Sequence, residues 1–295
     1  MKKTKKNKGK WSRKFFQALI GVWNCWSLSN ERYRYCESLK YDILGLTELH
    51  NTQDKELYQK RGWVCSAHAE QGENGKSSDP AAGVAIMLSP RMADKIIGQG
   101  RVGTRITWVR IKGPVCNIFY VVVYIPHKGR TAKPVAKDTI KLIKELLKTV
   151  AKSDCIILAD DFNCQLQRNI QGCTGQWSMT ERPNKNGHGE EILNLLREFD
   201  LFAVGTAFKP KKKLWSGKYR TCNATYMPKE EGKRPTKLDY LCVSNRYKAM
   251  VINTKLRAIN TPFWPTIRPW IPDRHVALEN KEKREKHAAK LRGHE

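Results

Sequence analysis

The chain has 295 residues, of which 40% are hydrophobic and nine are tryptophan, so it can bury a substantial core in one large domain or two small ones. Its 55 lysine and arginine residues against 28 aspartate and glutamate residues give a formal charge of +27. This charge favours a polyanionic partner, nucleic acid first and an anionic membrane surface second, and argues against a small-molecule substrate.

Residues 1–14 are rich in lysine, which predicts a basic, disordered tail. The apolar stretch after it is broken by Gln17 and lacks a signal-peptidase site, so we expect an intracellular chain. The run KKTKKNKGK is typical of nuclear import signals and favours the nucleus. Nine cysteines without a CxxC pair, several of them inside apolar strands, predict reduced core thiols rather than zinc ligands.

The first half of the domain, which we place at residues 15–278, is rich in predicted strands. Residues 18–28 and 41–49 predict two strands, and residues 30–40 predict a helix with Asn30 as its N-cap. A polar loop then leads to three strands in succession with turn signals between them, at residues 81–89, 104–113 and 115–125. The last of these is the longest apolar run of the chain. It is too short to span a bilayer and is rich in β-branched residues, so we expect a central strand.

The second half alternates helices and strands. Residues 135–152 have helical spacing, the run that starts at Ile156 is a strand, residues 190–200 are a second helix and residues 237–244 are a further strand. Meander strands mixed with helix-linked strands imply an α/β sandwich in which helices cover packed sheets. Residues 279–295 predict a charged C-terminal helix.

A basic segment separates the second helix from the strand at residues 237–244. In it, Trp215 and Tyr219 alternate with lysine and arginine, a pattern typical of surfaces that stack on bases and contact phosphates. We expect nucleic-acid contacts from this segment, through Lys211, Lys212, Lys213, Trp215, Lys218 and Arg220.

Polar side chains stand at the ends of several predicted strands. They are Asn24, Glu48, Tyr124, Asp161, Asn163, Asp239 and His275. Phosphodiester hydrolysis uses such a set, because carboxylates hold Mg²⁺ against a phosphate oxygen, amides orient water and a histidine manages protons. The pair Asp160–Asp161 also mimics the paired-aspartate motif of polymerases, but the polar segment NCQLQRN after it does not fit the apolar strand that this motif requires.

In their order along the chain, the motifs WNCWS, LTELH, YIPH, DFN and LDYLCVS, followed by His275, resemble those of the endonuclease/exonuclease/phosphatase superfamily. The strongest resemblance is to the apurinic/apyrimidinic (AP) endonuclease-like domains of LINE-type retrotransposons and the related craniofacial development protein 2-like proteins. It implies a four-layer α/β sandwich of two packed mixed sheets flanked by helices, as in deoxyribonuclease I. It also implies a Mg²⁺-dependent endonuclease that nicks DNA, with abasic sites as candidate targets, and leaves 3′-hydroxyl and 5′-phosphate ends.

The resemblance also implies roles for the polar residues. Glu48 is the expected principal ligand of Mg²⁺, for which Mn²⁺ is a candidate substitute, and Asn24 and Asp161 complete the expected metal site. Asp161 would in addition orient or deprotonate the attacking water, and Asn163 would position this water or the phosphate.

Tyr124 would hydrogen-bond a phosphate oxygen. His275 would stabilise the phosphorane or transfer a proton, and Asp239 would fix the tautomer of His275. One departure lies here, since Arg274 separates His275 from the acid that adjoins it in the family. Two alternatives therefore stay open. They are a catalytically inactive nucleic-acid-binding relative and a phosphatase or phospholipase branch of the superfamily.

Overall fold

The computed structural model describes residues 17–50, 64–67, 82–127, 132–181, 188–209, 224–226, 235–252, 254, 257–258 and 270–271. Several sequence-based predictions lie outside these ranges. They are the basic tail, the charged C-terminal helix, His275 with its neighbour Arg274, and the six residues expected to contact nucleic acid between Lys211 and Arg220.

The smaller sheet contains four strands in the order β1-β2-β4-β3. Its strands are β1 (Ile20–Asn24), β2 (Ile43–Thr47), β3 (Val64–Ala67) and β4 (Val84–Leu88). β1 and β2 are parallel and are connected by helix α1 (Asn30–Ser38), whereas β4 runs antiparallel to both of its neighbours. The strand–helix–strand unit predicted for the start of the domain is therefore confirmed.

The larger sheet contains six strands in the order β5-β6-β7-β8-β10-β9. They are β5 (Ile96–Val102), β6 (Ile106–Ile111), β7 (Ile118–Tyr124), β8 (Cys155–Asp161), β9 (Leu201–Ala203) and β10 (Asp239–Ser244). β7 and β8 are parallel and are connected by helix α3 (Ala132–Lys148), while the other pairs are antiparallel.

Shorter elements complete the described chain. Helix α4 (Gly189–Glu198) precedes β9, and helix α2 (Pro90–Ala93) follows β4. Two 3-10 helices, η2 (Val204–Thr206) and η3 (Asn245–Met250), follow β9 and β10. Two short strands, β11 (Arg257–Ala258) and β12 (Trp270–Ile271), form a separate two-stranded sheet.

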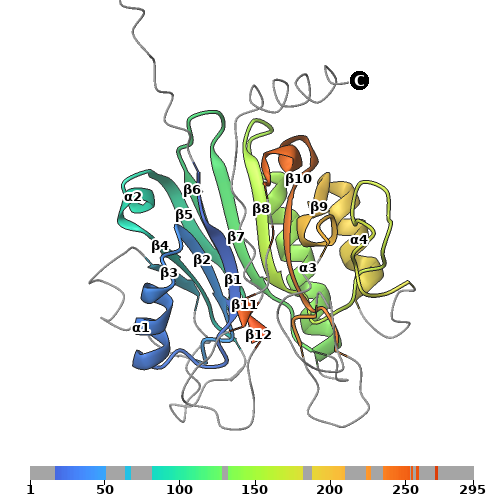
Figure 1. Ribbon diagram of the computed structural model, residues 1–295, viewed down its shortest axis with the longest axis horizontal. Helices are drawn as coiled ribbons and strands as arrows, with labels where there is room; N and C mark the ends of the chain where they lie inside the picture. The colour runs from blue at the N-terminus through green and yellow to red at the C-terminus, as the bar shows by residue number, and fades with distance from the viewer. Residues whose placement is uncertain are drawn as a thin grey trace, which may run out of the picture.

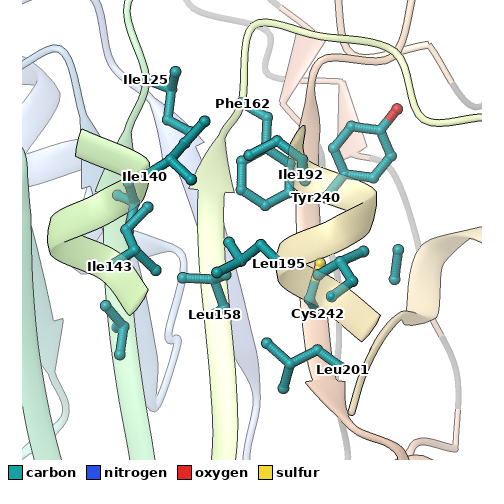
Figure 2. Close-up of a cluster of buried hydrophobic side chains, with 14 of the residues drawn as sticks. Ile125, Ile140, Ile143, Leu158, Phe162, Ile192, Leu195, Leu201, Tyr240 and Cys242 are labelled. Carbon is teal, nitrogen blue, oxygen red and sulfur yellow. The ribbon is translucent and has the colours of Figure 1, made fainter. Parts of the chain in front are cut away.

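The two sheets pack against each other with helices on their outer faces (Figure 1), and three apolar layers hold this sandwich together. The first lies between the two sheets and includes Ile20, Ile43 and Tyr120. The second lies between the smaller sheet and α1, and the third between the larger sheet and helices α3 and α4. Figure 2 shows the third layer, in which side chains of both helices pack on β8 and β10. Two mixed sheets with helices on their outer faces form the predicted four-layer α/β sandwich.

The two sheets also make polar and close backbone contacts. The hydroxyl of Tyr120 on β7 donates a hydrogen bond of 2.7 Å to the carbonyl oxygen of Gly21 on β1. A Cβ atom at Gly45 of β2 would lie 2.6 Å from the Tyr120 hydroxyl oxygen, so the sheets approach too closely there for a larger residue. The separation of the sheets is therefore fixed by these contacts.

The structure corrects three local predictions. The N-cap of α1 is Ser29 rather than Asn30, because the Ser29 hydroxyl accepts the N–H of Arg32 at 3.3 Å. Val115 is 60% exposed and precedes β7, which begins only at Ile118. The strand β5 was missed because Gly98, Gly100 and Gln99 interrupt its apolar pattern, which an edge strand with one exposed face tolerates.

Within the described part of the chain, seven of the nine cysteines are free thiols, and six of these seven are buried. This agrees with the prediction of reduced core thiols for that part of the chain. No helix within the described ranges is long and apolar enough to cross a membrane.

Candidate active site

The site begins with three residues in a row across the larger sheet. Tyr124 at the end of β7 pairs with Asp161 at the end of β8, and Asp161 pairs with Asp239 at the start of β10. Residues two apart on a strand share a face, and Val122, Ala159 and Leu241 belong to the layer between the sheets. The row therefore faces the smaller sheet at one rim of the sandwich.

Asp160 lies on the opposite face of β8. Its neighbour two residues earlier, Leu158, packs in the layer beneath α3 and α4. Strand alternation therefore directs the fully buried Asp160 toward the helices and Asp161 toward the other sheet. Of the two adjacent acids, only Asp161 belongs to the row.

The smaller sheet contributes Asn24 from the end of β1. Its side-chain amide donates a hydrogen bond of 2.8 Å to a carboxylate oxygen of Asp161. Its side-chain oxygen accepts the backbone N–H of Trp26 at 3.1 Å. Asn24 thus connects the two sheets at the rim and holds Asp161 in place.

Glu48 follows β2 directly and extends the site. Its backbone is left-handed, with φ of +54°, and its side chain is 18% exposed. One carboxylate oxygen lies 3.7 Å from Nε2 of His50, a histidine that the sequence analysis did not single out. The carboxylate of Glu48 is therefore accessible from solvent while its backbone is fixed by the turn.

Asn163 closes the turn after β8. Its backbone N–H donates to Asp161 at 3.1 Å, and its side-chain amide donates to the carbonyl oxygen of Ile125 at 2.9 Å. The residue therefore connects the segments that follow β7 and β8. One role of Asn163 is to fix this turn, which the sequence pattern did not indicate.

The carboxylates of the site repel one another. Burial raises the pKa of Asp161 well above its usual range, the negative charges of Asp239 and Glu48 raise it further, and the hydrogen bond from Asn24 opposes the shift. Such a cluster favours a bound cation, since a cation would stabilise the ionised carboxylates.

The donor atoms suit a hard divalent cation, because carboxylate and amide oxygens are the ligands that Mg²⁺ prefers. Among the described residues, however, no three aspartate, glutamate, histidine or cysteine side chains stand close enough together to form a complete cage. Glu48, Asn24 and Asp161 therefore fit Mg²⁺ by chemistry and shared location, with water and substrate left to supply the other ligands.

Arg105, which the sequence analysis missed, adds a buried cation beside this cluster. It directly precedes β6, is 7% exposed, and its guanidinium carbon lies 5.0 Å from the centre of the Tyr124 ring. Burial lowers the pKa of Arg105, while Tyr124 and Glu48 raise it. Burial in turn raises the pKa of the Tyr124 hydroxyl, as do Glu48 and Asp161. The Tyr124 hydroxyl therefore stays protonated and can donate to an anionic oxygen.

Left-handed backbone conformations are concentrated around the site. Of the eight non-glycine residues with positive φ in the described ranges, five flank it, namely Trp26, Ser27, Glu48, His50 and Asn163. Such conformations cost roughly 1–3 kcal/mol each and persist where the surrounding structure fixes them. Their concentration at this rim is typical of functional sites.

Solved structures of other proteins share this fold. An AP endonuclease from Leishmania major matches 90% of this chain and 88% of its own, with a TM-score of 0.61 and 13% sequence identity. The chain has the fold of the AP endonucleases. A second AP endonuclease, from Archaeoglobus fulgidus, matches 89% of this chain and 99% of its own, with a TM-score of 0.59 and 13% identity.

A third structure with the AP endonuclease fold is a 3′ phosphatase from Neisseria bound to a product DNA hairpin. It matches 89% of this chain and 99% of its own, with a TM-score of 0.60 and 16% identity. The fold predicted from the sequence is therefore confirmed, and with it the resemblance to this group of proteins.

Among curated proteins, the chain is similar to craniofacial development protein 2. It is 24% identical to the protein from Bos taurus and 22% identical to that from Tragulus javanicus, over 244 residues in each case. The match covers 81% of this chain but only 38% and 39% of those proteins, so the chain spans about two fifths of their length. No protein-family model matches the chain.

Proposed function

We propose that this chain is a Mg²⁺-dependent endonuclease that hydrolyses phosphodiester bonds in DNA. The observation that carries this proposal is the alignment of Tyr124, Asp161 and Asp239 in one row, with Asn24 and Glu48 on the facing sheet. The fold shared with AP endonucleases and with a DNA 3′ phosphatase supports the same chemistry. The formal charge of +27 supports a polyanionic substrate.

Glu48, Asn24 and Asp161 would hold the metal ion, which when bound polarises a phosphate oxygen. Asp161 accepts a proton from the attacking water through its carboxylate. Tyr124 donates its hydroxyl hydrogen to a non-bridging phosphate oxygen, and Arg105 beneath its ring offsets the negative charge that develops.

The remaining roles extend to residues outside the described ranges. His275 stabilises charge on the phosphate, and Asp239 orients its imidazole ring. The structure brings β12 into contact with β1, and β12 ends four residues before His275 in the sequence. The basic segment from Lys211 to Arg220 supplies further contacts to nucleic acid, through its lysine and arginine side chains and Trp215.

The finer aspects of the proposal rest on the resemblance to LINE-type endonuclease domains and to craniofacial development protein 2. They are an origin in a LINE-type retrotransposon, abasic sites as preferred targets, and action in the nucleus. The match covers only about two fifths of the curated relatives, so the proposal does not extend to the rest of those proteins.

The test is nicking of supercoiled plasmid by the purified chain, in Mg²⁺ and in EDTA, with Glu48→Gln beside it. We expect nicking only with Mg²⁺ and a loss of about 100-fold or more in Glu48→Gln. Glu198→Gln, an exposed change on α4, is the matched control and should retain full activity. Salt-sensitive DNA binding without nicking would instead indicate an inactive nucleic-acid-binding relative.

A further inference from the structure

Trp26 is an exposed aromatic residue at the rim of the site. Its side chain is 52% exposed, among the most exposed of the large hydrophobic side chains in the described ranges. An exposed tryptophan offers an aromatic surface on which a flat ligand can stack.

The backbone around Trp26 is fixed against the ends of β1 and β2, the two strands of the smaller sheet that border the site. The Trp26 N–H donates to the Asn24 side chain at 3.1 Å, and the next N–H, that of Ser27, donates to the carbonyl oxygen of Glu48 at 2.7 Å. Trp26 therefore stands directly beside two residues of the proposed metal site.

This turn is held in a conformation that costs free energy. Trp26 and Ser27 both have positive φ, of +39° and +80°. The guanidinium of Arg32 on α1 donates to the carbonyl oxygens of Cys25 at 2.9 Å and Ser27 at 2.7 Å, and also to that of Trp26. Arg32 thus stabilises a strained turn that presents an aromatic ring to solvent, an arrangement typical of ligand-binding sites.

We propose that Trp26 forms a stacking subsite for a nucleobase next to the cleaved phosphate, an inference that rests on the proposed nuclease function. In an intact duplex each base face is covered by its neighbours, so an aromatic ring at the rim can stack only on a base whose face is exposed. Single-stranded DNA and the gap at an abasic site offer such faces. The subsite therefore selects DNA with unstacked bases over intact duplex.

The test measures binding in EDTA, where no cleavage takes place, by fluorescence anisotropy of a single-stranded oligonucleotide and of the same sequence as an intact duplex. Trp26→Gly should weaken single-strand binding by about 5- to 100-fold, because base stacking on one aromatic residue is lost, and leave duplex binding unchanged. Trp26→Phe should bind the single strand with an affinity between those of the wild type and Trp26→Gly. Glycine adopts positive φ without strain, so Trp26→Gly should fold, which circular dichroism would check.

Two further variants separate stacking from other effects. Arg32→Met should weaken single-strand binding while leaving Trp26 in the chain, since the turn loses its anchor. Val115→Ala removes an exposed apolar residue that precedes β7, at the strand end opposite Tyr124, and should have no effect. Equal single-strand binding by Trp26→Gly and the wild type, or an equal loss on both DNA forms, would overturn the inference. Absence of Mg²⁺-dependent nicking by the wild type would instead overturn the proposed nuclease.

Discussion

Asn24 donates its side-chain amide to Asp161 across a gap of 137 residues in sequence, at 2.8 Å. This hydrogen bond joins the end of β1 in the smaller sheet to the end of β8 in the larger one. Since Asp161 also pairs with Tyr124 and Asp239, the site depends on correct packing of the two sheets. Assembly of the core and assembly of the site are therefore the same event.

The buried carboxylate of Asp161 should destabilise the metal-free fold. Its pKa is raised, so the folded chain binds this proton more tightly than the unfolded chain, and the group lowers stability increasingly as the pH rises from its unfolded pKa to its folded pKa. Asp161→Asn should therefore raise the free energy of unfolding in EDTA at pH 7, by about 1 kcal/mol. This gain in stability should vanish at pH values below about 4, the unfolded pKa of aspartate. Urea denaturation at pH 7 and below pH 4 would measure the difference between the variant and the wild type.

Asp154→Asn is the matched control for that experiment, because Asp154 is also a buried aspartate. Its carboxylate instead accepts Nε of Arg110 at 2.7 Å, so the substitution removes an ion pair. This substitution should lower stability at pH 7. The account of Asp161 fails if both substitutions change stability in the same direction.

Arg105 should contribute to turnover through its contact with Tyr124. Arg105→Met keeps an apolar stem but removes the charge, and should lower kcat by about 100-fold, as removal of one charge-stabilising donor does in other enzymes. Arg105→Lys should recover part of this loss. Arg101→Met, an exposed change on β5, should leave kcat unchanged, and steady-state kinetics on an oligonucleotide would compare the three.

Cys116 should be the most reactive of the described thiols. A hydrogen bond with Cys155 and contacts with Tyr247 and Arg246 lower the pKa of Cys116 to about 7, and the side chain is half-buried, whereas Cys155 is fully buried. A lower pKa gives more thiolate at neutral pH, so alkylation by iodoacetamide should reach half its maximal rate near pH 7. Mass spectrometry would identify the labelled residue. Cys155→Ala should raise the pH at which alkylation of Cys116 is half-maximal, because the hydrogen bond from Cys155 is lost. An unchanged pH would contradict the role given to this hydrogen bond.

Gly45 should tolerate no larger residue, because a Cβ atom there would lie 2.6 Å from both the Tyr120 hydroxyl oxygen and a methyl carbon of Val122. Gly45→Ala should lower the free energy of unfolding by about 1–3 kcal/mol, the usual cost of overpacking. At Gly98 the nearest atom would be 3.5 Å away, so Gly98→Ala should change stability by less than about 0.5 kcal/mol. Thermal denaturation would compare the two variants, and equal stabilities would contradict this account of Gly45.

The sequence predicted most of the fold, since the central elements have strong patterns. β7 and β8 are continuous apolar runs, and α3 has clear helical spacing, so these elements were found to within a few residues. β3, β5, β9 and α2 were missed. β5 is an edge strand with glycines, while β3 and α2 have four residues each and β9 has three, too few to show a period.

The candidate site was only partly predictable from sequence. Asn24, Glu48, Tyr124, Asp161 and Asp239 end or flank strands and belong to recognisable motifs. Arg105 was missed because its role depends on the pairing of β6 with β7, which brings it under the Tyr124 ring. No role was predicted for Trp26, because exposure and positive φ cannot be read from a sequence.

The most direct test of the account compares two adjacent acids of β8. The cleavage rate of an end-labelled DNA duplex with saturating Mg²⁺ would be measured for the wild type, Asp161→Asn and Asp160→Asn, with folding of each checked by circular dichroism. Asp161 faces the proposed site and should be needed for catalysis, so its substitution should slow cleavage by about 100- to 10,000-fold. Asp160 faces the helices, and its substitution should leave the rate within about threefold of the wild type. Equal rates for the wild type and Asp161→Asn, or equal losses in the two variants, would contradict the assignment of this rim as the catalytic site.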